Sequence, residues 1–106
     1  MKSSYIIVLV TAKDKIEASK IARGLLEAKL IACANIMDGV QSLFWWEGKI
    51  DFSSEALLVI KTKKTLFKKV CSQVKSLHSY QTPEIIALPI IDGSKEYLRW
   101  IQSSCA

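Results

Sequence analysis

The 106-residue chain has no long hydrophobic run. Its longest apolar runs cover residues 6–10 and 85–91, far short of the ~20 residues that a membrane-spanning helix needs. The run near the N-terminus is also too short for the core of a secretory signal peptide, and charged residues follow it at once. We therefore expect one domain, residues 1–106, that is cytoplasmic and has no membrane partner.

Arginine, histidine and paired cysteines are scarce as well. The net charge is +5, but only two arginines are present, and arginine is the side chain that most often reads nucleic-acid bases. Lysines gather between residues 61 and 75, and we interpret them as a solvated helix surface rather than a nucleic-acid interface. Three widely spaced cysteines predict neither a disulfide framework nor a zinc knuckle, so we interpret them as small buried apolar groups.

Four segments have the apolar, β-branched composition of strands: residues 5–10, 33–46, 49–62 and 84–88. The first is continuously apolar, which is typical of a strand buried on both faces. The last is expected to be a core strand, and Pro89 indicates its end or an edge position. Asp38-Gly39 could make a hairpin turn. We favour a bulge or bend in one long strand, because the extended pattern continues beyond it and Glu47-Gly48 supplies a better reversal.

Three segments have the spacing of amphipathic helices. Asp14 is the expected N-cap of the first helix, and Glu17 can complete a capping box while it points away from the sheet. Thr65 is the expected cap of the second helix, whose apolar face ends at His78. Ser94 is expected to cap a final helix.

The long hairpin has a geometric consequence. Residues 33–46 span about 46 Å when extended at ~3.3 Å per residue, whereas a domain of this length is only about 33 Å across. The hairpin must therefore bend or project, and its end carries Phe44, Trp45 and Trp46. Since exposed aromatic ribbons aggregate, we expect a homo-oligomer whose partners cover them. The alternative is that these aromatic residues fold back onto their own core.

The order strand–helix–strand–strand–helix–strand, followed by a C-terminal helix, predicts an α+β fold of the ferredoxin-like, split βαβ type. The sheet is antiparallel, its helices lie on one face, and residues 33–62 form a long hairpin. One short helix cannot cover the second face, which again indicates a partner chain.

Polar side chains crowd residues 78–91, next to the last predicted strand, as in the mouth of a binding site. His78 is the only histidine, and a zinc or copper site usually takes three or four ligands, so one subunit offers no complete site. Glu84 could approach His78 and form a histidine–carboxylate pair. Equally, His78 could be structural, bonded to Glu84 or to a carbonyl group.

Two further kinds of site use the same region. His78, Tyr80 and Glu84 near Lys61 could form an acid–base site. The sequence nevertheless lacks GxSxG, HExxH and P-loop motifs, so we do not expect an enzyme. Alternatively, a cleft between subunits for a small molecule or anion could be lined by Lys61, Tyr80, Gln81 and Trp46.

Several motifs together resemble a known family. ACANI at residues 32–36, WEGK at 46–49, KT at 61–62 and YQTPEI at 80–85 are similar to motifs of the CutA divalent-cation tolerance proteins. The resemblance covers nearly the whole chain. It implies a ferredoxin-like subunit, a tightly packed homotrimer built by the long hairpins, and an architecture similar to that of the PII signalling proteins.

The resemblance also implies a function and a site. It implies tolerance of copper or another divalent cation, with metal ligands at the positions of Val10, Leu77 and His78. Only His78 has a ligating side chain here. The positions that match family motifs form the expected intersubunit pocket for a metal ion or small ligand: Cys33, Trp46, Lys61, Tyr80 and Glu84. The alternative is a PII-like regulatory trimer that binds an anionic metabolite and a target protein.

Overall fold

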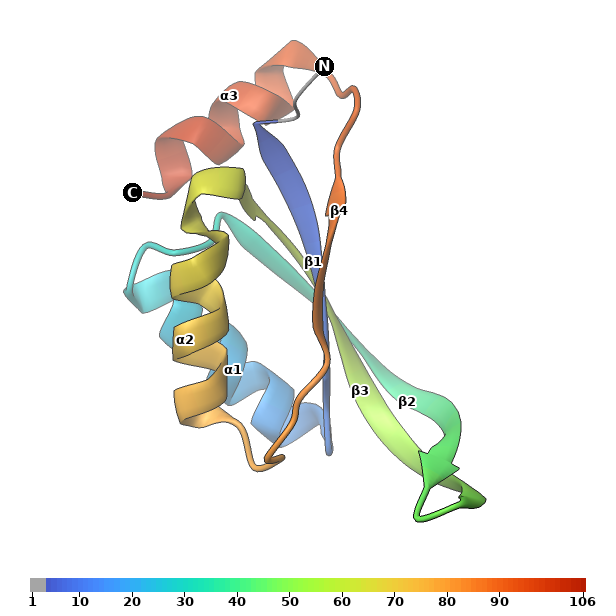
Figure 1. Ribbon diagram of the computed structural model, residues 1–106. Coiled ribbons are helices and arrows are strands. Elements are labelled where there is room, and N and C mark those ends of the chain that lie inside the picture. The colour runs from blue at the N-terminus through green and yellow to red at the C-terminus, as the bar shows by residue number, and fades with distance from the viewer. Residues whose placement is uncertain (1–3) are drawn as a thin grey trace.

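The elements follow the predicted order in a computed structural model that describes residues 4–106 (Figure 1). They are β1 (Tyr5–Ala12), α1 (Lys15–Glu27), β2 (Cys33–Trp46), β3 (Lys49–Lys63), a 3-10 turn (Lys64–Leu66), α2 (Phe67–Leu77), β4 (Ile85–Pro89) and α3 (Lys95–Ser104). The strands form one antiparallel sheet in the order β2-β3-β1-β4. The predicted α+β, ferredoxin-like fold is confirmed.

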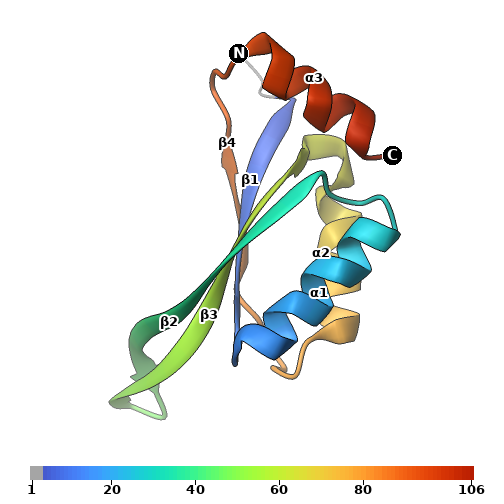
Figure 2. The same cartoon turned by 180° about the vertical axis from the view of Figure 1, so that it is seen from behind.

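The main core lies between the sheet and the helices α1 and α2, which cover the same face (Figures 1 and 2). Val8, Val10 and Ala12 of β1 are fully buried on this side, against Ile21 and Leu25 of α1. The alternate residues of β1 are only half-buried, so the expectation of burial on both faces is wrong for this chain. The physical reason is that no helix covers the second side of the sheet within residues 4–106.

We call this second side the open face. Its side chains come from all four strands and alternate with the core residues. Its apolar side chains in the described chain are Ile7, Leu9, Met37, Leu57, Val59, Ile86 and Leu88, and Thr11, Cys33, Asn35 and Lys61 lie on the same face. Met37, Ile86 and Leu88 are 47%, 51% and 46% exposed, so β4 is not the core strand that was expected. An apolar sheet surface of this kind is unusual in a monomer.

The helix starts agree with the sequence in two cases out of three. Asp14 accepts a hydrogen bond from the backbone of Glu17 at 2.8 Å, and Ser94 accepts one from Tyr97 at 3.2 Å, so both caps are confirmed. The expected cap at Thr65 is wrong. The chain enters α2 through the 3-10 turn, which places Leu66 at the N-cap position without a side-chain hydrogen bond.

The C-terminal helix α3 lies across one end of the sheet (Figure 1). It forms a second small core with the start of β2 and the 3-10 turn, through Ile101, Cys105, Ala32 and Leu66. Of the three cysteines only Cys105 is buried, whereas the other two are half-buried. The interpretation of all three as buried groups is therefore correct for Cys105 alone.

The hairpin of β2 and β3 leaves the body of the domain and projects past it (Figures 1 and 2). The pairing register shifts between Met37 and Val40, and Gly39 adopts a φ of 69°, so the predicted bulge within one long strand is confirmed. The reversal occurs at Glu47-Gly48, as expected. Trp45 and Trp46 are 73% and 61% exposed, so the alternative in which they fold back onto their own core is wrong.

Candidate functional site

His78 is held by two hydrogen bonds directly after α2. Its imidazole is fully buried, with Nε2 lying 2.7 Å from the carbonyl oxygen of Thr11 and Nδ1 lying 3.0 Å from the backbone nitrogen of Tyr80. A carbonyl oxygen only accepts and a backbone N–H only donates. Nε2 therefore carries the hydrogen and Nδ1 accepts, so neither ring nitrogen has a lone pair left for a metal ion.

The carboxylate beside His78 is Glu17, whose side chain is buried. Its Oε2 accepts from the backbone of Ser79 and its Oε1 from the backbone of Lys13, both at 3.0 Å, and Oε1 lies 3.7 Å from His78 Nδ1. Burial by itself raises the pKa of Glu17, but the hydrogen bonds from Ser79 and Lys13 outweigh it and hold the pKa below its usual value. Glu17 thus stays charged and ties the start of α1 to the end of α2.

Sequence reasoning missed Glu17, because its helical position was taken to point into solvent. The expected capping box was the available signal. A glutamate at the third helical position can turn back toward the chain before the helix. Here it does so, but it accepts from Lys13 rather than from the N-cap residue Asp14.

Tyr80 connects this region to the base of the hairpin. Its hydroxyl donates to Glu55 Oε2 at 2.7 Å, and its ring centroid lies 4.6 Å from that of His78. Burial, followed by the hydrogen bond and charge of Glu55, raises the pKa of Tyr80 far above its usual value. The hydroxyl therefore remains a hydrogen-bond donor throughout the physiological range and is unsuited to act as a base.

Cys33 and Lys61 form a second group at the other end of the open face. They are direct partners in the register of β2 and β3, and the Lys61 ammonium donates to the side chain of Asn35. Tyr97 of α3 reaches the same place. Burial raises the pKa of Tyr97, and the interaction with the nearby Cys33 raises it further.

The other two predicted pocket residues lie apart from both groups. Trp46 is at the tip of the hairpin, and Glu84 is exposed in the segment before β4. The carboxylate that approaches His78 is Glu17 rather than Glu84. Within one chain, the structure therefore joins Cys33 with Lys61 but does not bring the five predicted pocket residues together.

A metal centre does not fit the residues of a single chain. Residues 4–106 contain no group of three or more histidine, cysteine, aspartate or glutamate side chains that could hold an ion. The position of Val10 is fully buried in the core, and both ring nitrogens of His78 are already engaged. The assignment of His78 as a metal ligand stays a prediction that requires the loss of at least one of its hydrogen bonds.

Comparison with known proteins identifies the family. The family model described as CutA1 divalent ion tolerance protein matches residues 6–104. The chain belongs to this family. Solved CutA structures have the same fold: CutA1 from Oryza sativa gives a TM-score of 0.96 at 40% identity, covering 99% of this chain and 96% of that chain. The periplasmic divalent cation tolerance protein CutA from Archaeoglobus fulgidus gives 0.92 at 45% identity, covering 94% and 97%.

Curated CutA relatives differ in length. The divalent-cation tolerance protein CutA of Archaeoglobus fulgidus is 46% identical over 97 residues, which cover 92% of this chain and 94% of the relative. Protein CutA 1, chloroplastic, of Oryza sativa subsp. japonica is 42% identical over 99 residues, 93% of this chain. The chain spans about half the length of the two plant relatives, 56% of the rice protein and 54% of the chloroplastic CutA of Arabidopsis thaliana.

The names of these relatives place them in different compartments, one in the chloroplast and one in the periplasm. In the described part of the chain, no helix is long and apolar enough to cross a membrane. The cytoplasmic location stays a prediction.

Proposed function

We propose that this chain acts in divalent-cation tolerance as a homotrimer whose subunit clefts hold a metal ion or a small ligand. The observation that carries the proposal is a sheet that is unfinished in three respects. Its open face is apolar, its two edge strands β2 and β4 have free outer edges within residues 4–106, and its hairpin projects exposed tryptophans. A second copy of the chain can complete all three.

The outer edge of β4 has a defined set of free backbone groups. Consecutive residues of an antiparallel strand point their backbone groups to alternate sides. The Ile90 N–H bonds to the Tyr5 carbonyl at 3.0 Å, so the backbone groups of Ile85, Ala87 and Pro89 point away from β1. Pro89 lacks an N–H, but because this position points outward, no hydrogen bond within the chain is lost.

The outer edge of β2 follows from the same rule. The Lys64 N–H bonds to the Ser4 carbonyl at 2.9 Å, so even-numbered residues of β3 point their backbone groups toward β1 and odd-numbered ones toward β2. Lys61 is paired with Cys33, which turns the backbone groups of Ala34 and Ile36 outward. On each edge two of these residues carry an outward N–H, Ala34 and Ile36 on β2 and Ile85 and Ala87 on β4, at the same two-residue spacing.

Continuing the antiparallel sheet places β4 of one copy against β2 of the next. If Ala34 lies opposite Ala87 and Ile36 opposite Ile85, each pair exchanges two hydrogen bonds. A shift by two residues in either direction puts Pro89 or Pro83 opposite one of them and loses a bond. A shift by one residue would turn the open-face side chains of β4 outward. One register is therefore preferred.

This contact joins two different surfaces of the chain, so a repeated contact of this kind generates a ring. The resemblance to the family implies that the ring closes at three subunits. The open faces then line the interior of the ring. The same register sets Glu84 of the partner subunit beside Met37, next to the hairpin base at which Tyr80 bonds to Glu55. In the proposed ring, Tyr80 of one copy and Glu84 of the next line one cleft. The engaged nitrogens of His78 favour a small ligand over a metal ion at that residue.

Sedimentation equilibrium at micromolar concentration tests the assembly, and a mass close to that of one chain would refute it. Calorimetric titration of copper and zinc into the wild type and His78→Gln tests the metal. Equal binding in the two proteins removes His78 as a ligand, whereas a loss confined to the variant supports it. A thermal-shift screen of anionic metabolites against the same proteins tests the regulator alternative, since a ligand of the native state raises the midpoint.

A further inference from the structure

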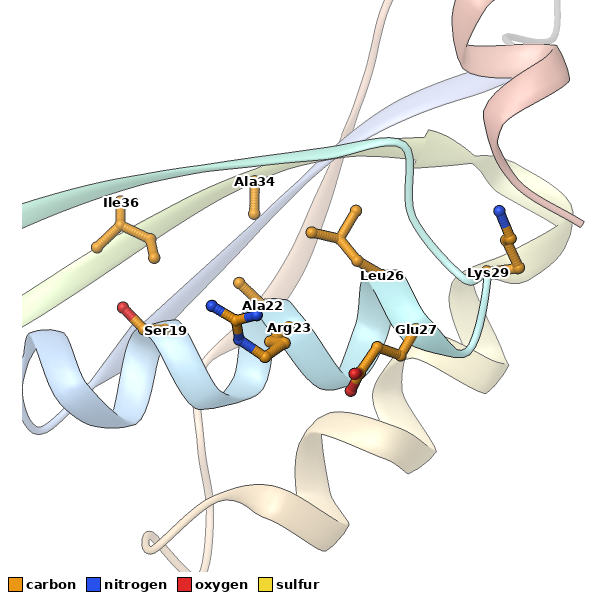
Figure 3. Close-up of a pocket in the computed structure, with 8 residues that line it drawn as sticks. All are labelled: Ser19, Ala22, Arg23, Leu26, Glu27, Lys29, Ala34 and Ile36. Atoms are coloured by element: carbon orange, nitrogen blue, oxygen red, sulfur yellow. The ribbon is translucent and has the colours of Figure 1, made fainter.

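Two shallow grooves run along the free edges of the sheet, both on the side that the helices cover. The first, of about 560 Å³, lies over β2, and Figure 3 shows Ala34 and Ile36 pointing from the strand toward α1, which contributes Arg23 and Leu26 to the lining. The grooves exist because α1 and α2 pack over the middle of the sheet and leave its edge strands partly uncovered.

The second groove, of about 470 Å³, lies over β4. Ala87 and Pro89 of the strand line it, together with Phe67 from the start of α2. Lys64 and Lys68 line it as well. Each groove is lined by an edge strand of the sheet and the helix above it, so neither has a second wall in a single chain.

The proposed ring joins these grooves. Ala34 and Ala87 of the partner subunit become cross-strand neighbours, with Cβ atoms about 5 Å apart on the helix-covered side. The floor of the first groove then continues into the floor of the second. Because both central residues are alanines, the seam carries little side-chain volume. The two half-grooves form one trough between α1 of one copy and α2 of the next.

The trough is cationic. Arg23 and Lys29 come from the first half and Lys64 and Lys68 from the second, against one carboxylate, that of Glu27. The walls between these charges are apolar, through Leu26, Ile36 and Phe67. Sites for small molecules have the same composition, mostly apolar with a few charged groups that fix orientation.

We infer that each subunit interface carries a site, on its outer helical surface, for a small organic anion with a flat apolar body and a phosphate or carboxylate group. The apolar body lies over the Ala34–Ala87 seam and the anionic group lies between Arg23 and Lys68. This site is separate from the cleft of Tyr80 and Glu84, and it rests on the proposed ring because neither chain supplies both walls.

Isothermal titration with 1-naphthyl phosphate tests the site, with inorganic phosphate as the ligand that lacks the apolar body. We expect one naphthyl phosphate per subunit and binding at least tenfold weaker for inorganic phosphate. Arg23→Glu and Lys68→Glu each weaken binding about tenfold, because each replaces a charge-assisted contact with repulsion. Lys20→Glu and Lys75→Glu change the net charge equally on exposed surfaces of the same helices, outside both grooves, and leave binding within twofold.

Mixed assemblies show whether the site is shared between copies. After co-refolding of Arg23→Glu and Lys68→Glu chains in equal amounts, about a quarter of the interfaces in randomly mixed rings receive both wild-type side chains. Those interfaces recover wild-type affinity, whereas a site within one chain recovers none. The site would be refuted if the trimer does not bind naphthyl phosphate, or if Lys20→Glu and Lys75→Glu weaken binding as much as Arg23→Glu and Lys68→Glu. Neither result would contradict the proposed ring. A wild-type monomer would instead overturn the proposed function itself.

Discussion

Replacing Tyr80 with phenylalanine removes one hydroxyl group and keeps the ring beside His78. In the wild type this hydroxyl donates to Glu55 Oε2 at 2.7 Å, and Glu55 is only 8% exposed. It is the one side-chain donor to that carboxylate in residues 4–106, so the variant leaves a buried charge without it. An unsatisfied buried polar group costs about 1–3 kcal/mol, and we expect Tyr80→Phe to lower the free energy of unfolding by about 2 kcal/mol.

Thermal unfolding at one fixed protein concentration measures this loss, because the midpoint of an oligomer depends on concentration. For a domain of about 100 residues, 2 kcal/mol corresponds to a fall of roughly 10 °C. The matched background is Glu55→Leu, which has no carboxylate that could lose its hydrogen-bond donor. Adding Tyr80→Phe to Glu55→Leu should cost at least 1 kcal/mol less than adding it to the wild type. Equal costs in the two backgrounds would refute the reasoning.

The same pair makes a prediction about alkaline pH. Because the pKa of Tyr80 is raised in the folded chain, mainly by burial and then by Glu55, the folded state holds the proton more tightly than the unfolded state. The resulting stabilisation is complete below the ordinary tyrosine value of about 10 and is lost as pH rises above it. The stability difference between wild type and Tyr80→Phe should therefore be constant from pH 7 to 9 and shrink above pH 10. A difference that already shrinks between pH 7 and 9 would contradict this assignment.

Three other substitutions test separate parts of the structure. Glu17→Gln should make the free energy of unfolding, measured in urea, fall less steeply at acid pH. The lowered pKa of Glu17 stabilises the folded state above about pH 4.3, and this contribution disappears as pH falls through the pKa of Glu17 in the folded state. An unchanged dependence on acid pH would count against this role of Glu17. Gly39→Ala should lower the free energy of unfolding by about 1 kcal/mol in the same assay, because a φ of 69° is strained for alanine. The added Cβ has no atom within 4 Å, so no steric clash adds to this cost. An unchanged free energy of unfolding would mean that the backbone of the bulge relaxes. Ala34→Pro removes an N–H that points outward from β2, so it should dissociate the ring and preserve the circular dichroism of the subunit; an intact ring would exclude the proposed strand pairing.

The sequence predicts the order of elements because each follows from local chemistry. Polar turn residues separate segments of clear apolar period, and the continuation of the aromatic pattern beyond Asp38-Gly39 identifies a bulge instead of a turn. Thr65 shows the limit of such reasoning. A threonine before an apolar stripe is a reasonable cap, but the intervening 3-10 turn moves the start of α2 one residue further on.

The candidate site is less accessible to sequence reasoning, because its contacts join residues far apart in the chain. The partner of His78 depends on where the ends of β1 and α2 meet, and the meeting point supplies Thr11 and Glu17. The acceptor of the Tyr80 hydroxyl comes from the hairpin base, 25 residues earlier. No periodicity specifies these pairs. The same holds for the burial of β1 and β4, which depends on what covers the open face.

The most direct test of the proposed assembly is the solution mass of the wild type beside that of Ile86→Lys. Ile86 is 51% exposed in the single chain, so a lysine there is harmless to a monomer. In the ring the same position lies inside, and an unpaired buried charge is strongly unfavourable. Sedimentation equilibrium at micromolar concentration should give three times 11.9 kDa for the wild type and dissociated, folded subunits for Ile86→Lys. A wild type that sediments as a single chain, or a ring unaffected by Ile86→Lys, would contradict the account.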